Sequence, residues 1–131
     1  MKEVDVQQVN TRYMYHDACL LLAYCALIFY LSHQSALPTV MSFPHQDKLV
    51  HACAYGVMAI LAWRVFRYSA HPLHITLLLA AVFCSLYGIS DEYHQSFIVG
   101  RNADVWDWCA DTVGAVLSML LLQRWLQRQH P

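Results

Sequence analysis

The sequence has few charged residues. Lys, Arg, Asp and Glu make up 13% of the 131 residues, about half of the roughly 25% typical of soluble domains. Apolar residues reach 58%, and a chain this short has too little interior to hide them from water. The low charge excludes a soluble globular domain, and the high hydrophobicity excludes a disordered chain. A small protein that crosses a membrane several times fits this composition.

The sequence also has no block of basic residues. The formal net charge is −1, and the isoelectric point is about 6.7. Proteins that bind nucleic acid usually carry a basic patch to neutralise phosphates. We therefore expect no nucleic-acid partner.

Paired cysteine motifs are missing as well. The five cysteines lie inside apolar segments, without a CxxC spacing, and their number is odd. A disulfide framework or a cysteine-based metal site is therefore not expected. The cysteines are best interpreted as small buried apolar residues.

Four apolar segments follow a polar stretch at residues 1–12, which we interpret as a short tail. They span residues 13–31, 49–66, 73–90 and 105–122. Each is near the lower end of the roughly 17–25 residues that a membrane-spanning helix needs, and none alternates with a period of two. The long polar lead and the lack of a cleavage site favour a retained first helix over a signal peptide. We predict an all-α, integral membrane bundle of four transmembrane helices that forms one domain over residues 1–131.

Lys and Arg are unevenly distributed among the connections. Six belong to the termini and the second connection, and two to the first and third connections: Lys2, Arg12, Arg64, Arg67, Arg124 and Arg128 against Lys48 and Arg101. Basic residues accumulate on the cytoplasmic side. Both termini are therefore predicted to lie in the cytoplasm, with the first and third connections outside.

Acidic residues gather at the opposite, outer end. Six of the nine acids lie at or just inside the outer ends of segments two to four: Asp47, Asp91, Glu92, Asp104, Asp107 and Asp111. Ionisable groups at this depth are costly and usually functional. On a helix, Asp104, Asp107 and Asp111 fall within about 80° of arc. Similar stripes join Asp47, Lys48, His51 and Tyr55 on the second segment and Gly88, Asp91, Glu92 and Gln95 on the third, if its helix continues past Ser90.

Three polar stripes at one membrane level predict a shared pocket that faces inward. Gly56, Gly88 and Gly114 would let the helices approach closely there. An alternative remains for Asp47 and Asp104, because an acid at a helix start also caps free N–H groups. Capping does not explain Asp111, which lies about 10 Å deeper along its helix. We expect Asp111 to pair with Lys48, Arg101 or His51, or to be protonated.

Two blocks of sequence resemble the VanZ-like family of bacterial membrane proteins. The first, residues 47–56 (DKLVHACAYG), matches a D-K-x-x-H-x-x-x-Y pattern. The second, residues 92–115, follows a family pattern of the form E-x-x-Q-x-F-x-x-G-R-x-x-x-x-x-D-x-x-x-N-x-x-G. Asp111 stands where the family usually has Asn, and Val99 stands where Pro is frequent. The resemblance implies a multi-pass protein of the bacterial inner membrane that acts near the cell envelope and is linked to teicoplanin resistance.

Three interpretations of the outer pocket compete. In the first, it binds a lipid headgroup, a lipid-linked cell-wall intermediate or a lipidated glycopeptide such as teicoplanin, with Lys48 and Arg101 facing phosphate or carboxylate. In the second, it is an enzyme on such a substrate, with Glu92, Asp107 or Asp111 as general acid or base and His51 as proton shuttle. In the third, the cluster is only a structural ion-pair network.

The ligand-binding candidates share their position at the outer end. They are Asp47, Lys48, His51, Tyr55, Glu92, Gln95, Arg101, Asp104, Asp107 and Asp111. No cofactor is expected, although Asp47 and His51, four residues apart, could share a divalent ion. The expected partner is a membrane lipid or lipid-linked envelope molecule, and the oligomeric state is left open.

Overall fold

The structure is a bundle of four helices. The computed structural model describes residues 2–35 and 44–129, and side chains from residue 11 onward. The helices are α1 (Lys2–Ser32), α2 (Gln46–Phe66), α3 (Leu73–Gln95) and α4 (Val105–Gln129), and no strand occurs in this part of the chain. Each helix contains a stretch long and apolar enough to cross a membrane. The predicted all-α membrane bundle is therefore confirmed.

The helices are longer than the apolar segments that predicted them. The prediction of a tail at residues 1–12 was wrong, because α1 already begins at Lys2. Residues 2–12 contain several strong helix formers and no Gly or Pro, so the helix continues beyond the apolar stretch. For the same reason α3 runs past Ser90 to Gln95, and α4 extends to Gln129.

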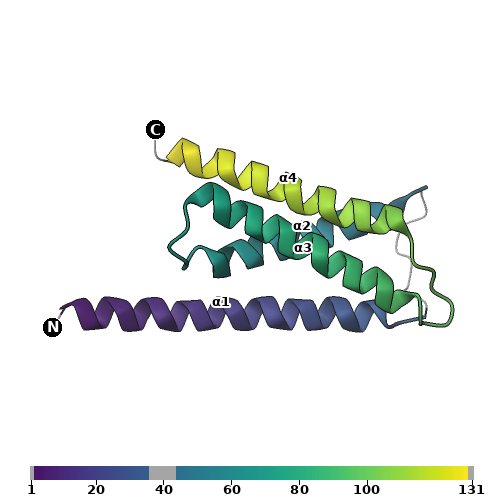
Figure 1. Cartoon of the computed structure of the whole chain (residues 1–131), viewed down its shortest axis with the longest axis horizontal. Coiled ribbons are helices and arrows are strands. Elements are labelled where there is room, and N and C mark those ends of the chain that lie inside the picture. Colours follow the sequence, from purple (N-terminus) through teal and green to yellow (C-terminus); the bar gives the residue numbers. More distant parts are fainter. Residues whose placement is uncertain (1, 36–43, 130–131) are drawn as a thin grey trace.

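Successive helices run in opposite directions (Figure 1). Both termini and the turn between α2 and α3 therefore lie at one end, and the end of α1, the start of α2 and the connection from α3 to α4 lie at the other. Residues 36–43 of the first connection fall outside the described part of the chain. That the end with the termini faces the cytoplasm remains a prediction from the basic residues.

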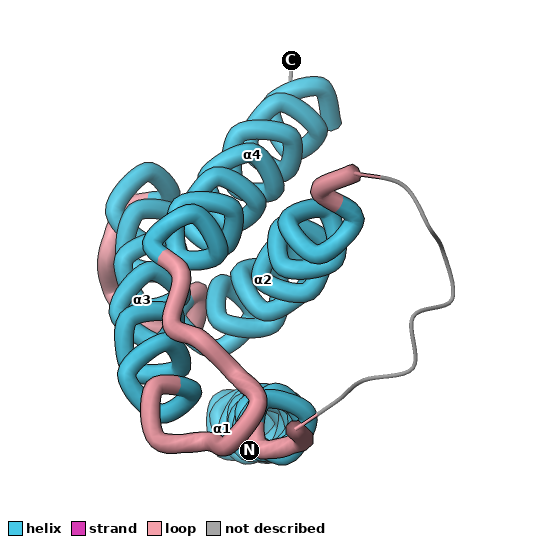
Figure 2. The backbone as a smooth tube through the Cα atoms, turned by 90° about the vertical axis from the view of Figure 1, so that its right-hand side faces the viewer, coloured by secondary structure: helices cyan, strands magenta, loops and turns pink. Residues whose placement is uncertain are grey.

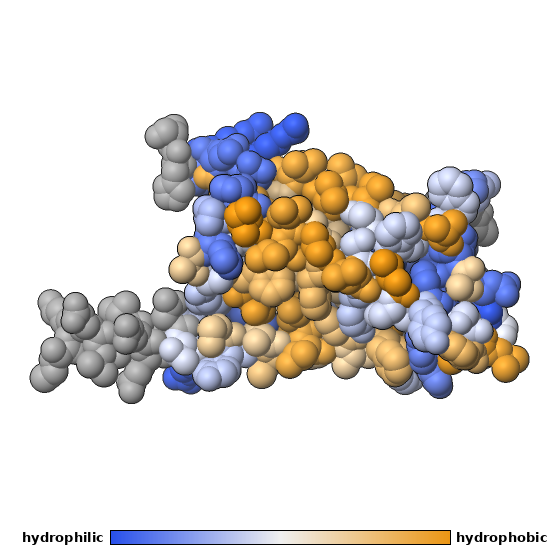
Figure 3. Space-filling view, viewed as in Figure 1, coloured by the Kyte–Doolittle hydropathy of each residue, from blue (hydrophilic) through white to orange (hydrophobic). Residues whose placement is uncertain are grey.

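The helices are arranged around the bundle in the order α1, α3, α4, α2, as Figure 2 shows. α4 packs on α2 and α3, and α1 lies against the same two helices. Small residues dominate the interior, including Ala59, Ala62, Ala80, Cys84 and Ala115. Large apolar side chains point outward instead and form a band around the middle of the molecule (Figure 3). This inside-out distribution suits a bundle surrounded by lipid, where close helix contact depends on small residues.

Two glycines bring α2 and α4 together. A Cβ at Gly114 would overlap the Ala52 carbonyl, and one at Gly56 would lie 2.6 Å from Ser118 Oγ. On α3, a Cβ at Gly88 would lie 2.9 Å from Asp111 Oδ2. The expected role of all three glycines in close helix approach is confirmed. This approach sets the distance across which the polar side chains of α2, α3 and α4 meet.

Candidate functional site: a polar cluster shared by α2, α3 and α4

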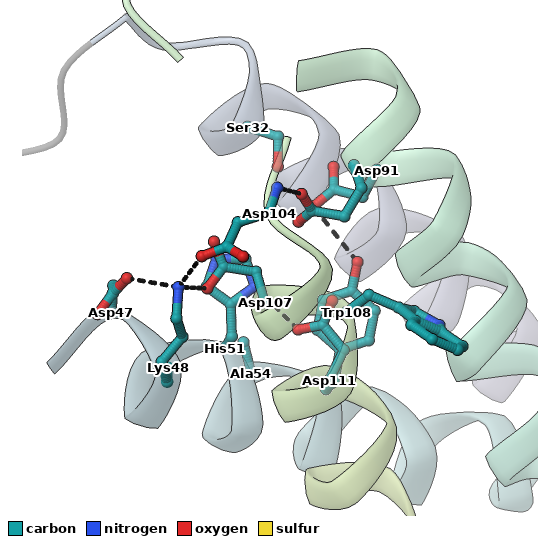
Figure 4. Close-up of polar contacts among 12 residues, drawn as sticks. Ser32, Asp47, Lys48, His51, Ala54, Asp91, Asp104, Asp107, Trp108 and Asp111 are labelled. Carbon is teal, nitrogen blue, oxygen red and sulfur yellow. Dashed lines mark hydrogen bonds and ion pairs between the residues drawn. The ribbon is translucent and has the colours of Figure 1, made fainter. Parts of the chain in front are cut away.

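Lys48 is the centre of the polar cluster. Its Nζ donates hydrogen bonds to Asp47 Oδ2 (2.9 Å), Asp104 Oδ2 (2.5 Å) and Asp107 Oδ1 (2.7 Å) (Figure 4). An ammonium group has three N–H donors, so all of them are used within the protein. Three carboxylates around one ammonium leave the site with an excess of negative charge. Lys48 therefore does not present the free donors that were expected to face a phosphate or carboxylate.

Asp104 combines two roles that the sequence offered as alternatives. Its Oδ1 accepts the Trp106 N–H at 2.9 Å and so caps α4, while Oδ2 binds Lys48. The hydrogen bond from Lys48 lowers the pKa of the Asp104 carboxyl below its usual value. Capping is therefore confirmed for Asp104, but it does not replace the contact with α2.

Asp47 is not the cap of α2. The residue before this helix is His45, which has a left-handed backbone conformation (φ 62°) and makes no capping hydrogen bond through its side chain. Asp47 lies in the first turn, where its charge meets the positive end of the helix dipole. Its carboxylate accepts a hydrogen bond from the Lys48 side chain.

Asp111 reaches across to His51. The His51 Nδ1 atom lies 2.9 Å from Asp111 Oδ1, and His51 Nε2 lies 4.0 Å from Asp107 Oδ2. The Asp111 side chain is fully buried. The expectation that this deep carboxylate pairs with a basic group is confirmed, with His51 as the partner. Because Asp107 also binds Lys48, Asp107 of α4 lies between Lys48 and His51 of α2.

Glu92 connects the end of α3 to the start of α4. Its Oε2 accepts the backbone N–H of Asp104 at 2.7 Å, while Oε1 is buried and has no partner among the described residues. Beside it, Asp91 Oδ2 accepts hydrogen bonds from Tyr55 (3.4 Å) and Gln95 (3.3 Å). Gln95 Nε2 also lies 3.3 Å from Ser32 Oγ of α1. Asp91 and Gln95 thus tie α1, α2 and α3 together beside the cluster that α2, α3 and α4 share.

Arg101 is the candidate that the structure does not connect to the cluster. Within residues 2–35 and 44–129, its side chain makes no hydrogen bond or ion pair, and its Nε is buried without a partner. It lies in the connection between α3 and α4, beside Gly100, whose φ is +86°. A positive φ at this turn favours glycine.

Among the described residues, one combination of side chains could hold a metal ion. His51, Glu92 and Asp111 each offer a ligand atom within 4.8 Å of the others. The pair that the sequence suggested is arranged differently, because Asp47 binds Lys48 and His51 binds Asp111. The third ligand, Glu92, comes from α3, so only the packing of three helices reveals this set.

An open groove of about 810 Å³ runs between α2 and α4 beside the cluster. Its polar end is formed by His45, Asp47, Lys48 and Asp104. Its other walls are mainly apolar, and they comprise Leu49, Ala52, Trp106, Cys109, Ala110 and Val113. The groove is thus charged at one end and apolar along the rest of its length.

A second buried ion-pair cluster, at the opposite end, was missed. Asp17 of α1 is 2% exposed and accepts hydrogen bonds from Arg64 (2.5 Å), Arg67 (3.5 Å) and Tyr68 (3.0 Å). An acid within an apolar segment is a signal for such a partner. In the sequence, Arg64 and Arg67 indicated only the orientation of the chain, and their contact with Asp17 was not predicted.

Comparison with known proteins identifies the family. The VanZ/LLP1 family model matches residues 18–126, which include parts of all four helices and the whole polar cluster around Lys48. The chain belongs to the VanZ/LLP1 family. It is thus a multi-pass membrane protein, and this membership fits a link to antibiotic resistance.

A relative of this VanZ/LLP1 protein is an uncharacterized protein of fission yeast. The two are 31% identical over 93 residues, which cover 70% of this chain and 53% of the relative. The chain therefore spans about half the length of the curated relative it matches. No solved structure gives a significant match.

Proposed function

We propose that this VanZ/LLP1 protein binds an amphiphilic molecule of the cell envelope in the groove between α2 and α4. The headgroup would lie at the Lys48 cluster and an acyl or polyprenyl chain along the apolar walls. The observation that carries the proposal is the groove itself, about 810 Å³ in volume, with charged residues at one end and apolar residues along the rest. An amphiphile has a matching arrangement, with a polar headgroup at one end and an apolar chain along the rest.

The charge of the cluster indicates what kind of headgroup it favours. Lys48 donates to three carboxylates, so the head of the groove offers mainly hydrogen-bond acceptors and negative charge. Such a site favours hydroxyl groups and ammonium groups over a bare phosphate. Lipid-linked sugars, amine-bearing lipids and lipidated glycopeptides such as teicoplanin carry these donors. The ligand classes expected from the sequence therefore stay in the proposal. The group that lies beside Lys48 and its three carboxylates would be a sugar or an amine, not a phosphate.

The place of action follows from the same proposal. The protein would lie in the bacterial inner membrane with its termini in the cytoplasm, so that the groove opens at the outer surface. There it would contact cell-wall intermediates and antibiotics that do not cross the membrane. The uneven distribution of basic residues supports this orientation.

The test fills the groove and measures bound lipid. Val113 lines the groove and is 53% exposed, whereas Ile89 lies on α3, outside the groove, and is 49% exposed. We expect Val113→Trp to lower the amount of co-purified lipid seen by native mass spectrometry about tenfold, equivalent to roughly 1.4 kcal/mol of binding. Ile89→Trp, a matched change at a surface that faces lipid, should have no effect. Equal lipid retention in both variants would contradict the proposal.

A functional readout accompanies the lipid measurement. Expression of the unaltered protein should lower teicoplanin sensitivity in a tester strain, and Val113→Trp should remove this protection at an unchanged membrane level. Loss of protection with Ile89→Trp as well would indicate a general effect of bulk instead of groove binding.

A further inference from the structure

We propose that His51, Glu92 and Asp111 bind one divalent transition-metal ion. They come from α2, α3 and α4, and one ligand atom of each lies within 4.8 Å of the other two. The site lies next to the Lys48 cluster, with His51 and Asp111 facing each other across the α2–α4 contact (Figure 4). The proposal does not depend on the amphiphile in the groove.

Unsatisfied buried oxygens point to a missing positive group. Glu92 is 8% exposed and Asp111 is fully buried, and both belong to the three-residue set. Glu92 Oε1 and Asp111 Oδ2 each lack a hydrogen-bond partner in the described part of the chain. A buried carboxylate oxygen without a partner is costly, and a cation between the two carboxylates would remove this cost.

The protein's own cations do not fill this role. Lys48 uses its three donors on Asp47, Asp104 and Asp107. His51 is then the basic group that contacts Asp111, and Asp91 on α3 and Asp107 on α4 add further negative charge nearby. One imidazole faces more carboxylates than it can neutralise, so a divalent ion would balance the charge.

The orientation of His51 suits a metal ligand. Its Nδ1 faces Asp111, and its Nε2 lies 4.0 Å from Asp107 Oδ2. If Nδ1 binds the ion, Nε2 is left on the side of Asp107, and Asp107 would have to move closer than 4.0 Å to accept its N–H. A carboxylate that receives the second N–H of a histidine ligand is a usual feature of metal sites, because it fixes the ring and its tautomer.

The donor set selects a class of metal. One imidazole nitrogen with two carboxylates is typical of zinc and similar transition metals, whereas Mg²⁺ and Ca²⁺ take oxygen ligands. Three protein ligands also match open zinc sites, in which a fourth position takes water or another ligand. Zinc ligands lie about 2.0–2.2 Å from the ion, so the three side chains would move closer together when the ion binds.

The first experiment measures metal binding to the whole protein. The full chain is purified in detergent, and a chelator removes any bound metal. The protein is then dialysed against Zn²⁺ alone, and its metal content is measured by inductively coupled plasma mass spectrometry. We expect one equivalent of Zn²⁺ to be retained, with much weaker retention of Mg²⁺. Retention below one tenth of an equivalent, or Mg²⁺ binding as tight as Zn²⁺ binding, would overturn the proposal.

The second experiment assigns the site. Glu92→Gln and Asp111→Asn keep the shape of the side chain and remove its charge, and each should weaken Zn²⁺ binding by about 10- to 100-fold or more. Asp47→Asn removes a charge from the neighbouring cluster and should leave Zn²⁺ affinity within about twofold, since weak screened coupling is all that remains. An equal loss in Asp47→Asn would mean that the acids attract Zn²⁺ only by their charge, which refutes the three-residue site.

A third measurement needs no variant. Co²⁺ replaces Zn²⁺ in protein sites and has an absorption spectrum that depends on its ligands. Intense visible bands that Zn²⁺ displaces would support a site of low coordination number with nitrogen and oxygen ligands. The spectrum of hydrated Co²⁺ would overturn it, even if the variants failed to fold. Because the Co²⁺ spectrum reports only on the metal ligands and not on bound lipid, a negative result would leave the proposed amphiphile groove unaffected.

Discussion

His51 Nδ1 on α2 lies 2.9 Å from the fully buried Asp111 Oδ1 on α4. The residues are 60 positions apart, and they meet because glycines at positions 56 and 114 allow the two helices to touch. The deepest acid of the cluster is thus held by a basic side chain from the neighbouring helix. The pair therefore adds a polar contact to the packing that holds α2 and α4 together.

Asp111 is expected to tolerate an amide better than an apolar residue. Asn keeps an oxygen that accepts a hydrogen bond from His51, whereas Ala leaves the buried ring nitrogen unpaired at a cost of about 1–3 kcal/mol. The apparent melting temperature in detergent should therefore fall little for Asp111→Asn and clearly for Asp111→Ala. Equal losses would show that the negative charge, not the hydrogen bond, stabilises the bundle.

The contact between Lys48 and Asp104 should make stability depend on pH. Because Lys48 lowers the pKa of Asp104 in the folded protein, the folded state holds this proton less tightly than the unfolded state. The stabilisation is fully present above the ordinary carboxyl pKa of about 3.9 and is lost as pH falls through the lower, folded value.

Asp104→Asn isolates this effect, because Asn also caps helices well but carries no charge. The melting temperature of the unaltered protein should exceed that of the variant near neutral pH, and the difference should shrink in acid. A difference that stays constant down to pH 2 would show that the charge of Asp104 contributes nothing.

Asp17 should stabilise the opposite end without affecting ligand binding. Its buried carboxylate accepts a hydrogen bond from Arg64 at 2.5 Å and thereby ties α1 to α2. Because hydrogen bonds to charged groups contribute about 1.5–3 kcal/mol, Asp17→Ala should lower the apparent melting temperature. Lipid and Zn²⁺ retained by the folded fraction should not change. Loss of either ligand from the folded fraction would mean that the two ends of the bundle are coupled.

Glu92 and Arg101 separate function from scaffolding. Arg101→Lys keeps the charge and removes the planar, two-pronged donor, and it breaks no hydrogen bond or ion pair with the described residues. If Arg101 contacts a ligand, protection against teicoplanin should disappear while the melting temperature stays the same. Parallel loss of protection and stability would favour a structural network.

Glu92→Gln then distinguishes a receptor from an enzyme. Loss of bound lipid would indicate binding alone, whereas an accumulated, unprocessed lipid on the variant would indicate that Glu92 acts as an acid or base. Native mass spectrometry of the purified variant gives this answer directly.

Membrane orientation is checked with fusions to alkaline phosphatase, which is active only outside the cytoplasm. A fusion after His130 should be inactive, and one after Pro44 should be active, because basic residues accumulate on the cytoplasmic side. The reverse pattern would place the charged end of the groove at the cytoplasmic surface, where it could not reach molecules on the outer side of the membrane.

The sequence by itself determined the number of helices and the gathering of acids at one end. Hydropathy and segment length are local properties, so residues 49–66 or 105–122 are recognisable without knowledge of their neighbours. The helical period likewise places Asp104, Asp107 and Asp111 on one face of α4. Antiparallel connections then bring the acidic ends of α2, α3 and α4 to the same level.

Tertiary structure alone decided which of these residues meet. The helical period relates residues within one helix, but the rotation and depth of one helix against another depend on packing at Gly88 and Gly114. That packing pairs His51 with Asp111 instead of Asp47 and uses all donors of Lys48 within the protein. Contacts between side chains on different helices depend on how closely, and at what rotation, the helices pack. The spacing of residues within one segment therefore does not predict them.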